Sequence, residues 1–246
     1  PIADYEITPD VAIVDPEIAE TMPKKLTAHT GMDALTHAIE AYVSTAANPF
    51  TDPLALSAIA MIGKDLKGSF DGDSLKRESV HYAQCLAGMA FTNGLLGIVH
   101  SMAHKTGASF ADCGSHIIHG CANAMYLPRV IEFNSKDERA KARYCIIADT
   151  LGISADSPNE KIKKLTEYLE DMNKALGIPT CIKNCGANGD ISSKSFMPED
   201  IFLKRVPEIA NEALLDACTL SNPRKISQSE MEKLLACCYY GTHVDF

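Results

Sequence analysis

Two polar side chains that stand four residues apart raise the question of what this chain does. In the segment 31–42, GMDALTHAIEAY, Asp33 and His37 lie inside a run with helical periodicity. Residues i and i+4 of a helix project from the same side, so this carboxylate and imidazole could reach one metal ion. The competing interpretation is a solvated helix face, because Thr30 and Glu40 extend the same polar stripe. This segment alone does not decide between the two.

A second pair of side chains has the same spacing in a more apolar setting. In LLGIVHSMAHKTGA, residues 95–108, His100 and His104 are surrounded by leucine, isoleucine, valine and methionine. A helix that is apolar nearly all round is buried, and a buried imidazole needs hydrogen bonds or a metal for its ring nitrogens. One such histidine is usually a core residue, whereas two on one face favour a shared ligand. Gly94 and Gly97 each cost about 1 kcal/mol of helix stability relative to alanine, which indicates a need for close packing or access.

A third segment, HIIHGCANAM, adds His116 and His119 at or just before the start of a further helix. One carboxylate and three imidazoles form a ligand set suited to a divalent first-row metal, Fe²⁺ or Zn²⁺. Such a set can leave a coordination position open for a substrate oxygen, which distinguishes a catalytic site from a closed structural one. The spacing therefore favours a helical metalloprotein with a catalytic function.

The elements that must position these side chains are helices nearly throughout. After residue 16 the pattern changes from short β-like runs, of which VAIV at 11–14 is the clearest, to long helical periodicity. Helices are predicted at 24–44, 52–68, 74–110 (as one or two helices), 119–132, 136–151, 158–176, 198–216 and 227–240. A turn is predicted around Gly72, and 183–195 is predicted to be a loop. The predicted fold class is all-α, with a short β-like remnant at the start.

Composition narrows the possible classes of function. The chain has 246 residues, a net charge of −9 and no cluster of lysine and arginine, so no nucleic-acid partner is expected. No run approaches the roughly 18 apolar residues of a membrane helix, and the acidic, proline-containing start is not a signal peptide. Nine irregularly spaced cysteines favour reduced thiols in a cytoplasmic protein. Without an initiator methionine, the chain is expected to be the later part of a longer one.

The histidine-bearing segments, taken in order, resemble the iron-containing (group III) alcohol dehydrogenases. The matching sequences are DPEIAETMPKKLTAHTGMDALTHAIEAY (15–42), LLGIVHSMAHKTGA (95–108), HGCANAMYLP (119–128), SNPR (221–224) and the closing YYGT. The resemblance covers essentially the whole chain and is strongest to the clostridial-type butanol and short-chain alcohol dehydrogenases. Members of this family have an N-terminal α/β dinucleotide-binding domain and a C-terminal all-helical metal-binding domain, with the active site in the cleft between them.

Carried over residue by residue, the resemblance implies that Asp33, His37, His100 and His119 are the metal ligands. His104 would lie near the substrate and the nicotinamide without binding the metal, as a catalytic and cofactor-binding residue. The reaction implied is the oxidation of an alcohol to an aldehyde or ketone by hydride transfer, with Fe²⁺ or Zn²⁺ polarising the substrate oxygen and NAD or NADP exchanging the hydride. His104 would relay the hydroxyl proton or orient the substrate.

Two departures from the family pattern bear on these expectations. Residues 111–115 look like an inserted loop and Ile118 stands where the family has proline, so His116 is an alternative to His119 as the last ligand. No glycine-rich phosphate-binding turn follows a strand. We therefore expect residues 1–20 to be the junction with, or last strand of, a missing nucleotide-binding domain. Residues 21–246 would form the all-helical metal and substrate domain, and this fragment alone is expected to be inactive.

The expected partners follow from that organisation. They are a small alcohol or aldehyde substrate, the missing domain and, because its absence leaves apolar surface exposed, further copies of this chain in a homo-oligomer. Neither a nucleic acid nor a membrane is expected. Two other functions remain open on the sequence. A freestanding helical metal-binding or assembly module without turnover of its own would fit the isolated chain. A metal-dependent hydrolase would need a carboxylate base beside an activated water, for which Glu40 is the obvious candidate.

Overall fold

Helical periodicity along the chain becomes a bundle of packed helices in the computed structural model, which describes residues 5–7, 9–110, 117–192 and 195–246. The α-helices of these ranges are α1 (Lys24–Val43), α2 (Thr51–Asp71), α3 (Ser74–Gly94), α4 (Ile98–Ala108), α5 (His119–Asn134), α6 (Glu138–Thr150), α7 (Pro158–Ala175), α8 (Glu199–Leu214) and α9 (Gln228–Tyr240). Short 3₁₀ helices are η1 (Tyr5–Ile7), η2 (Pro16–Ala19), η4 (Ile182–Asn184) and η5 (Ala217–Ser221). The predicted all-α class is confirmed, and each predicted helix is present.

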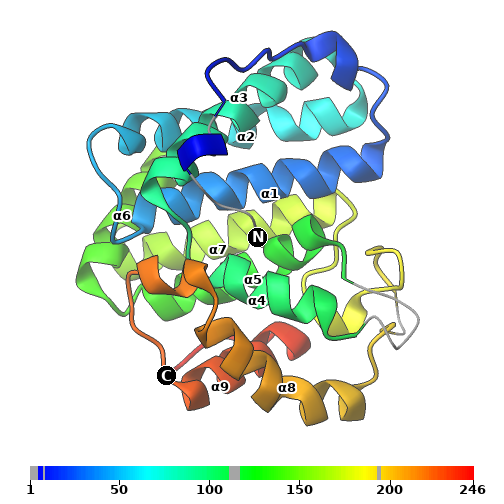
Figure 1. The fold of residues 1–246 in the computed structure, drawn as a ribbon, viewed down its shortest axis with the longest axis vertical. Helices are drawn as coiled ribbons and strands as arrows, with labels where there is room; N and C mark the ends of the chain where they lie inside the picture. The colour runs from blue at the N-terminus through cyan, green and yellow to red at the C-terminus, as the bar shows by residue number, and fades with distance from the viewer. Residues whose placement is uncertain (1–4, 8, 111–116, 193–194) are drawn as a thin grey trace.

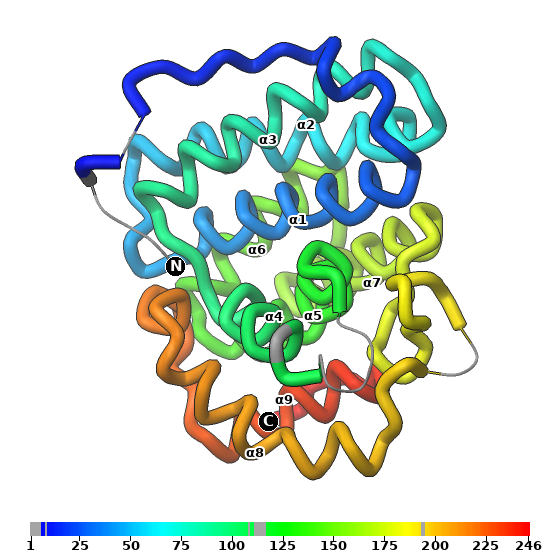
Figure 2. Tube along the Cα trace, turned by 45° about the vertical axis from the view of Figure 1, so that its right-hand side comes forward, coloured from blue at the N-terminus to red at the C-terminus, as the bar shows by residue number. Residues whose placement is uncertain are grey.

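Helix α1 lies at the centre of the arrangement (Figure 1). Helices α2 and α3 pack on it and on each other, while α5 packs on it from another side and contacts α4 and α7. Helices α8 and α9 pair and close the molecule beside α4 and α5, as the tube in Figure 2 shows. Because α1 and α5 are surrounded by other helices, both are buried along most of their length. Side chains on these two helices are therefore held in a packed interior.

The predicted region 74–110 forms two helices because the chain breaks between α3 and α4. Leu95 ends α3 with a φ of 61°, in the left-handed region that glycine prefers. Gly97 then precedes α4, and a Cβ at this position would lie 2.7 Å from Glu40 Oε1 and 2.9 Å from Asn222 Oδ1. The packing requirement predicted for Gly97 therefore has a physical basis, since the start of α4 lies directly against α1 and the segment after η5.

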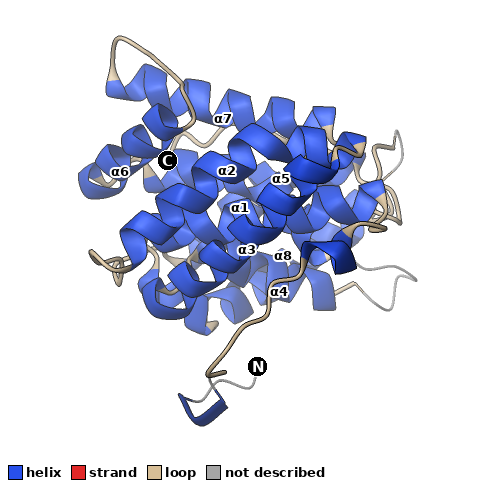
Figure 3. Cartoon of the chain, turned by 90° about the horizontal axis from the view of Figure 1, so that it is seen from above, coloured by secondary structure: helices blue, strands red, loops and turns tan. Residues whose placement is uncertain are grey.

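The predicted β-like remnant at the start of the chain is wrong. Residues 11–15 carry no strand assignment, and Val11 and Ile13 are 76% and 90% exposed. Figure 3 accordingly shows no strand in the described ranges. A strand needs a neighbouring strand for its backbone groups, and the one β-bridge within the described residues joins Cys185 to Ile191. The lead-in is held instead by Arg77 of α3, whose guanidinium donates to the carbonyls of Ala19 and Met22 at 3.0 and 2.8 Å.

Two further sequence-based expectations concern the membrane and the cysteines. In the described ranges no single helix is long and apolar enough to cross a membrane. Helix α3 and the stretch Ile98–Gly107 meet the length and composition criteria together, but they are bent by 102° at their junction. The eight cysteines in the described part of the chain are free thiols, as the sequence predicted; Cys113 lies outside it.

Candidate metal centre

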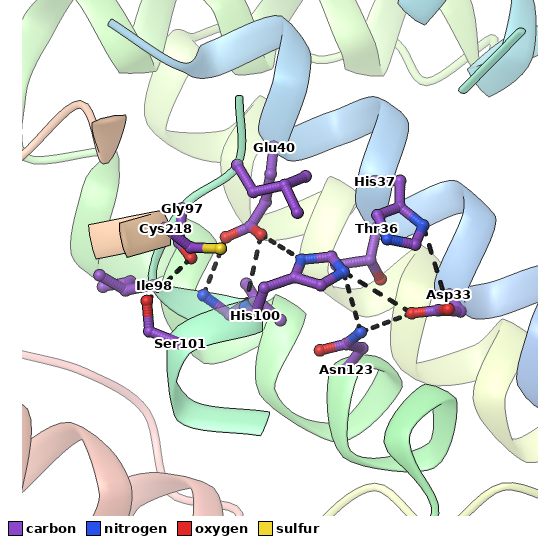
Figure 4. Close-up of polar contacts among 12 residues, drawn as sticks. Asp33, Thr36, His37, Glu40, Gly97, Ile98, His100, Ser101, Asn123 and Cys218 are labelled. Atoms are coloured by element: carbon purple, nitrogen blue, oxygen red, sulfur yellow. Dashed lines mark hydrogen bonds and ion pairs between the residues drawn. The ribbon is translucent and has the colours of Figure 1, made fainter. Parts of the chain in front are cut away.

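Three helices bring the predicted ligand residues together, and Figure 4 shows Asp33, His37 and His100 of this group. Helix α1 supplies Asp33 and His37, α4 supplies His100, and α5 begins with His119. One donor atom each from Asp33, His37 and His100 lies within 4.8 Å of the others, which is the separation expected of residues that could hold one ion. His119 is not in that tightest group, but its Nε2 lies 3.5 Å from Asp33 Oδ1. His116 lies outside the described residues.

The Asp33 carboxylate is the common neighbour of the three imidazoles. Its Oδ1 lies 3.7 Å from His100 Nε2 and 3.5 Å from His119 Nε2, and its Oδ2 lies 4.0 Å from His37 Nδ1. Metal–ligand bonds of about 2.0–2.2 Å in a tetrahedral set separate neighbouring donor atoms by about 3.4 Å. The observed separations are close to that value, and the oxygen and nitrogen donors suit Fe²⁺ or Zn²⁺. The residues present therefore fit a divalent metal of this kind.

Aromatic contacts fix the orientation of the buried rings. The His37 ring stacks between Phe91 of α3, at a centroid distance of 4.4 Å, and His100 of α4, at 4.3 Å. The interplanar angles are 18° and 26°, so the three rings form a nearly parallel stack. The stack joins side chains from α1, α3 and α4, and it limits rotation of the His37 ring.

The electrostatics of the group follow from burial and close opposite charge. Burial would raise the pKa of Asp33, but the hydrogen bond with His100 and the neighbouring imidazoles outweigh it and bring the pKa to about 2. Burial lowers the pKa of His37 to about 3 and also lowers that of His119. For His100 burial acts downward as well, but hydrogen bonds to Asp33 and Glu40 prevail and raise the pKa to about 9. The site thus holds an ionised carboxylate beside neutral His37 and His119.

Glu40 decides how the polar stripe of α1 is to be interpreted. The residue is 2% exposed, so the stripe is not a solvated face at its Glu40 end, whereas Thr30 at the other end is exposed. Glu40 Oε2 lies 2.5 Å from His100 Nδ1, and its Oε1 accepts the N–H of Val99 at 2.8 Å. A carboxylate on the far nitrogen of a ligand imidazole fixes the tautomer and the ring orientation. Glu40 faces that nitrogen rather than the side where the donor atoms converge, which argues against its use as a hydrolytic base.

His104 lies beside the ligand group without joining it. Its side chain is 41% exposed, and its ring stacks on His119 at 5.3 Å and 11°. Its Nδ1 lies 3.2 Å from Asp216 Oδ2, which also lies 3.4 Å from Lys105 Nζ. Cys218 comes close enough for His104, Asp216 and Cys218 to form a second possible ion-binding group. That group is the weaker one, because Lys105 already neutralises Asp216 and burial raises the pKa of Cys218 to about 12.

Sequence reasoning missed two polar residues next to the predicted ones. Asp216 is separated from His104 by 112 residues, and no local pattern connects them. Asn123 lies one helical turn after His119 in the motif HGCAN, so the same i, i+4 spacing that drew attention to Asp33 and His37 could have found it. For Glu40 the sequence predicts only the end of a polar stripe or a base, and not its contact with His100.

A cavity of about 790 Å³ opens beside the ligand group. Asp33, His37 and Phe91 are among its lining residues, as are Ile18, Met22 and Leu26. The volume lies in the usual range of small-molecule sites, and a mostly apolar lining with a few polar groups is typical of them.

Comparison with known proteins places these observations in one family. The model of the Fe-containing alcohol dehydrogenase family, C-terminal, matches residues 27–239. The NADPH-dependent butanol dehydrogenase of Clostridium saccharobutylicum is 54% identical over 246 residues, which are 100% of this chain and 59% of that protein. The bifunctional aldehyde-alcohol dehydrogenase of Escherichia coli K12 is 41% identical over 259 residues, covering 98% of this chain and 27% of that protein.

A solved structure gives the same result at the level of the fold. The iron-containing alcohol dehydrogenase of Thermococcus thioreducens superposes with a TM-score of 0.83 at 36% identity, over 98% of this chain and 57% of that one. The chain therefore spans a little under three fifths of both the butanol dehydrogenase and this structural relative.

Proposed function

This chain belongs to the Fe-containing alcohol dehydrogenase family, and from that membership we propose that it is the metal- and substrate-binding part of an NAD(P)-dependent alcohol dehydrogenase. The enzyme would interconvert a small alcohol and its aldehyde or ketone. One observation carries the proposal: Asp33, His37, His100 and His119 converge from three helices beside a cavity that Asp33 and His37 line. In this proposal residues 1–20 are the junction to a nucleotide-binding domain, and residues 21–246 form the metal-binding domain.

The four converging residues would hold Fe²⁺ or Zn²⁺. The metal, when bound, supplies Lewis acidity to the alcohol or carbonyl oxygen of the substrate. The protein supplies a negative charge for the metal and holds the ligand side chains in place. Asp33 brings the negative charge, with a pKa of about 2 that keeps it ionised at neutral pH. Glu40 and the ring stack hold His100 and His37 in fixed orientations. A preorganised site of this kind needs little rearrangement when the substrate oxygen arrives.

His104 would handle the hydroxyl proton and lie against the nicotinamide. In the tautomer in which Nδ1–H donates to Asp216 Oδ2, the nitrogen Nε2 is left to accept a proton. The ring is partly exposed and stacks on His119, so it lies between the ligand group and solvent, where a proton relay is needed. NADPH is the nicotinamide we favour, because the butanol dehydrogenase at 54% identity is described as NADPH-dependent.

Elemental analysis tests the ligand set directly. The chain is purified anaerobically without chelator, beside Asp33→Ala, His119→Ala and His104→Gln variants. We expect about one iron or zinc ion per chain, lost in the first two variants and retained in the third. His243→Ala is the control, because this histidine pairs with Glu132 away from the ligand group. If Asp33→Ala retained the metal of the unmodified chain, the proposed site would be wrong.

A further inference from the structure

The carboxamide of Asn123 lies in the middle of the proposed ligand group. The residue is on α5, one turn after His119, and is fully buried. Its Nδ2 lies 2.5 Å from Asp33 Oδ1, 3.1 Å from His100 Nε2 and 3.1 Å from His119 Nε2. Figure 4 shows the side chain between His100 and Asp33. This one nitrogen atom therefore lies within hydrogen-bond distance of the oxygen or nitrogen atom that three of the four proposed ligands would offer to a metal.

The amide nitrogen has more polar neighbours than it has hydrogens to donate. An amide nitrogen carries two hydrogens, whereas three potential acceptors surround it. The ionised Asp33 carboxylate can only accept. The neutral His119 ring can accept through the lone pair of its Nε2. His100 Nε2 also faces the Asp33 carboxylate, at 3.7 Å, so it need not accept from Asn123. The two amide hydrogens can therefore be matched by Asp33 Oδ1 and His119 Nε2.

The other end of the amide shows that these contacts fix its orientation. Asn123 Oδ1 is buried and finds no hydrogen-bond partner among the described residues. A buried acceptor without a partner is unfavourable, and a flipped amide would place this oxygen against the Asp33 carboxylate, where two acceptors repel. The N–H contacts to the ligand group therefore decide how the side chain lies.

We propose that Asn123 is a positioning residue for the metal site. One N–H holds the Asp33 carboxylate, and the other keeps the lone pair of His119 directed into the ligand group while no metal is bound. Metal binding would replace the contact with His119 and leave the N–H to Asp33 in place. The inference rests on the proposed function, since it needs these residues to be the ligands, and it adds a residue that the ligand motif does not include.

Zn²⁺ affinity, measured on the 246-residue chain by competition with a chromophoric chelator, tests this role. Asn123→Leu has a similar volume and no donor, and we expect it to weaken Zn²⁺ binding by about 10–100-fold, as loss of a partner of a ligand usually does. The matched control is Asn173→Leu. Asn173 is also buried, and its Oδ1 has no hydrogen-bond partner in the described part of the chain, but its Nδ2 donates to the Ala124 carbonyl at 2.8 Å and not to a proposed ligand. We expect Asn173→Leu to bind Zn²⁺ like the unmodified chain.

A second pair of variants separates donation from packing. Asn123→Ser and Asn123→Ala both remove side-chain volume, but only the serine variant retains a hydrogen-bond donor. We therefore expect the serine variant to bind Zn²⁺ more tightly than the alanine variant. Equal affinities for this pair, or an Asn123→Leu affinity equal to that of the unmodified chain, would overturn the positioning role. Asp33→Ala is measured in parallel. If that variant bound Zn²⁺ as tightly as the unmodified chain, the ligand set itself would fail, and the positioning role would fall with it.

Discussion

The site depends on residues that are not proposed metal ligands, and Glu40 is the clearest of them. The polar stripe of α1 ends in Glu40, which is buried because α4 begins directly against it and donates the Val99 N–H to its carboxylate. Nothing within α1 predicts this, since the covering element comes about 60 residues later. The same carboxylate also contacts the His100 ring. Glu40 therefore binds the first turn of α4 and orients a proposed ligand on that helix.

Leu95 is the residue that makes this approach of α4 possible, and its backbone is strained. A non-glycine residue at a φ of 61° with a ψ of −175° occupies a region that glycine prefers, and such strain costs about 1–3 kcal/mol. We expect Leu95→Gly to be more stable than Leu95→Ala by about 1 kcal/mol, the reverse of the usual order of these residues in helices. Both variants lose the same half-exposed side chain, so comparing them in urea unfolding isolates the backbone term. A more stable alanine variant would show that the turn is not strained.

At the scale of elements, the sequence predicts the helices well and their junctions less well. Apolar periodicity and the separating glycines and prolines locate α1 to α9, because those signals are local. The β-like remnant was predicted from the apolar run at 11–14, but a strand depends on a partner that the local sequence does not contain. Among the site residues, those with i, i+4 partners could be predicted. Asp216 could not, because the contact with His104 depends on where η5 packs.

The crossing of α1 and α5 is the element contact on which the site most depends. A Cβ at Gly120 would lie 2.2 Å from the His29 carbonyl oxygen, a backbone atom that cannot turn aside. We expect Gly120→Ala to lower the free energy of unfolding by about 1–3 kcal/mol, as overpacking does, and to weaken metal binding because His119 is the adjacent residue. Gly88→Ala is the matched control, since a Cβ placed there meets no described atom within 4 Å apart from its own stretch of α3. It should stabilise α3 by about 0.5–1 kcal/mol. The two substitutions should therefore shift the urea midpoint in opposite directions.

The whole molecule links metal binding to folding, because the ligand group exists only when distant parts of the chain are packed together. The four residues come from α1, α4 and α5, and α5 in turn packs against α7 and α9. Little of this site can persist in the unfolded chain. A ligand that binds only the folded state stabilises it by an amount set by the ratio of its concentration to its dissociation constant. Unfolded cysteines and histidines also bind Zn²⁺, which reduces that amount.

We therefore expect Zn²⁺ at about 100 times its dissociation constant to add about 2.7 kcal/mol of stability at most. For a chain of this length that corresponds to a rise in Tm of roughly 5–10 °C. Thermal unfolding followed by circular dichroism, with and without Zn²⁺ and then with excess chelator, measures it. The chelator should abolish the rise, and Asp33→Ala should show none, while His243→Ala should respond like the unmodified chain because its ring lies at Glu132. An equal rise in Asp33→Ala would mean that Zn²⁺ stabilises the protein from another site, and the linkage argued here would be wrong.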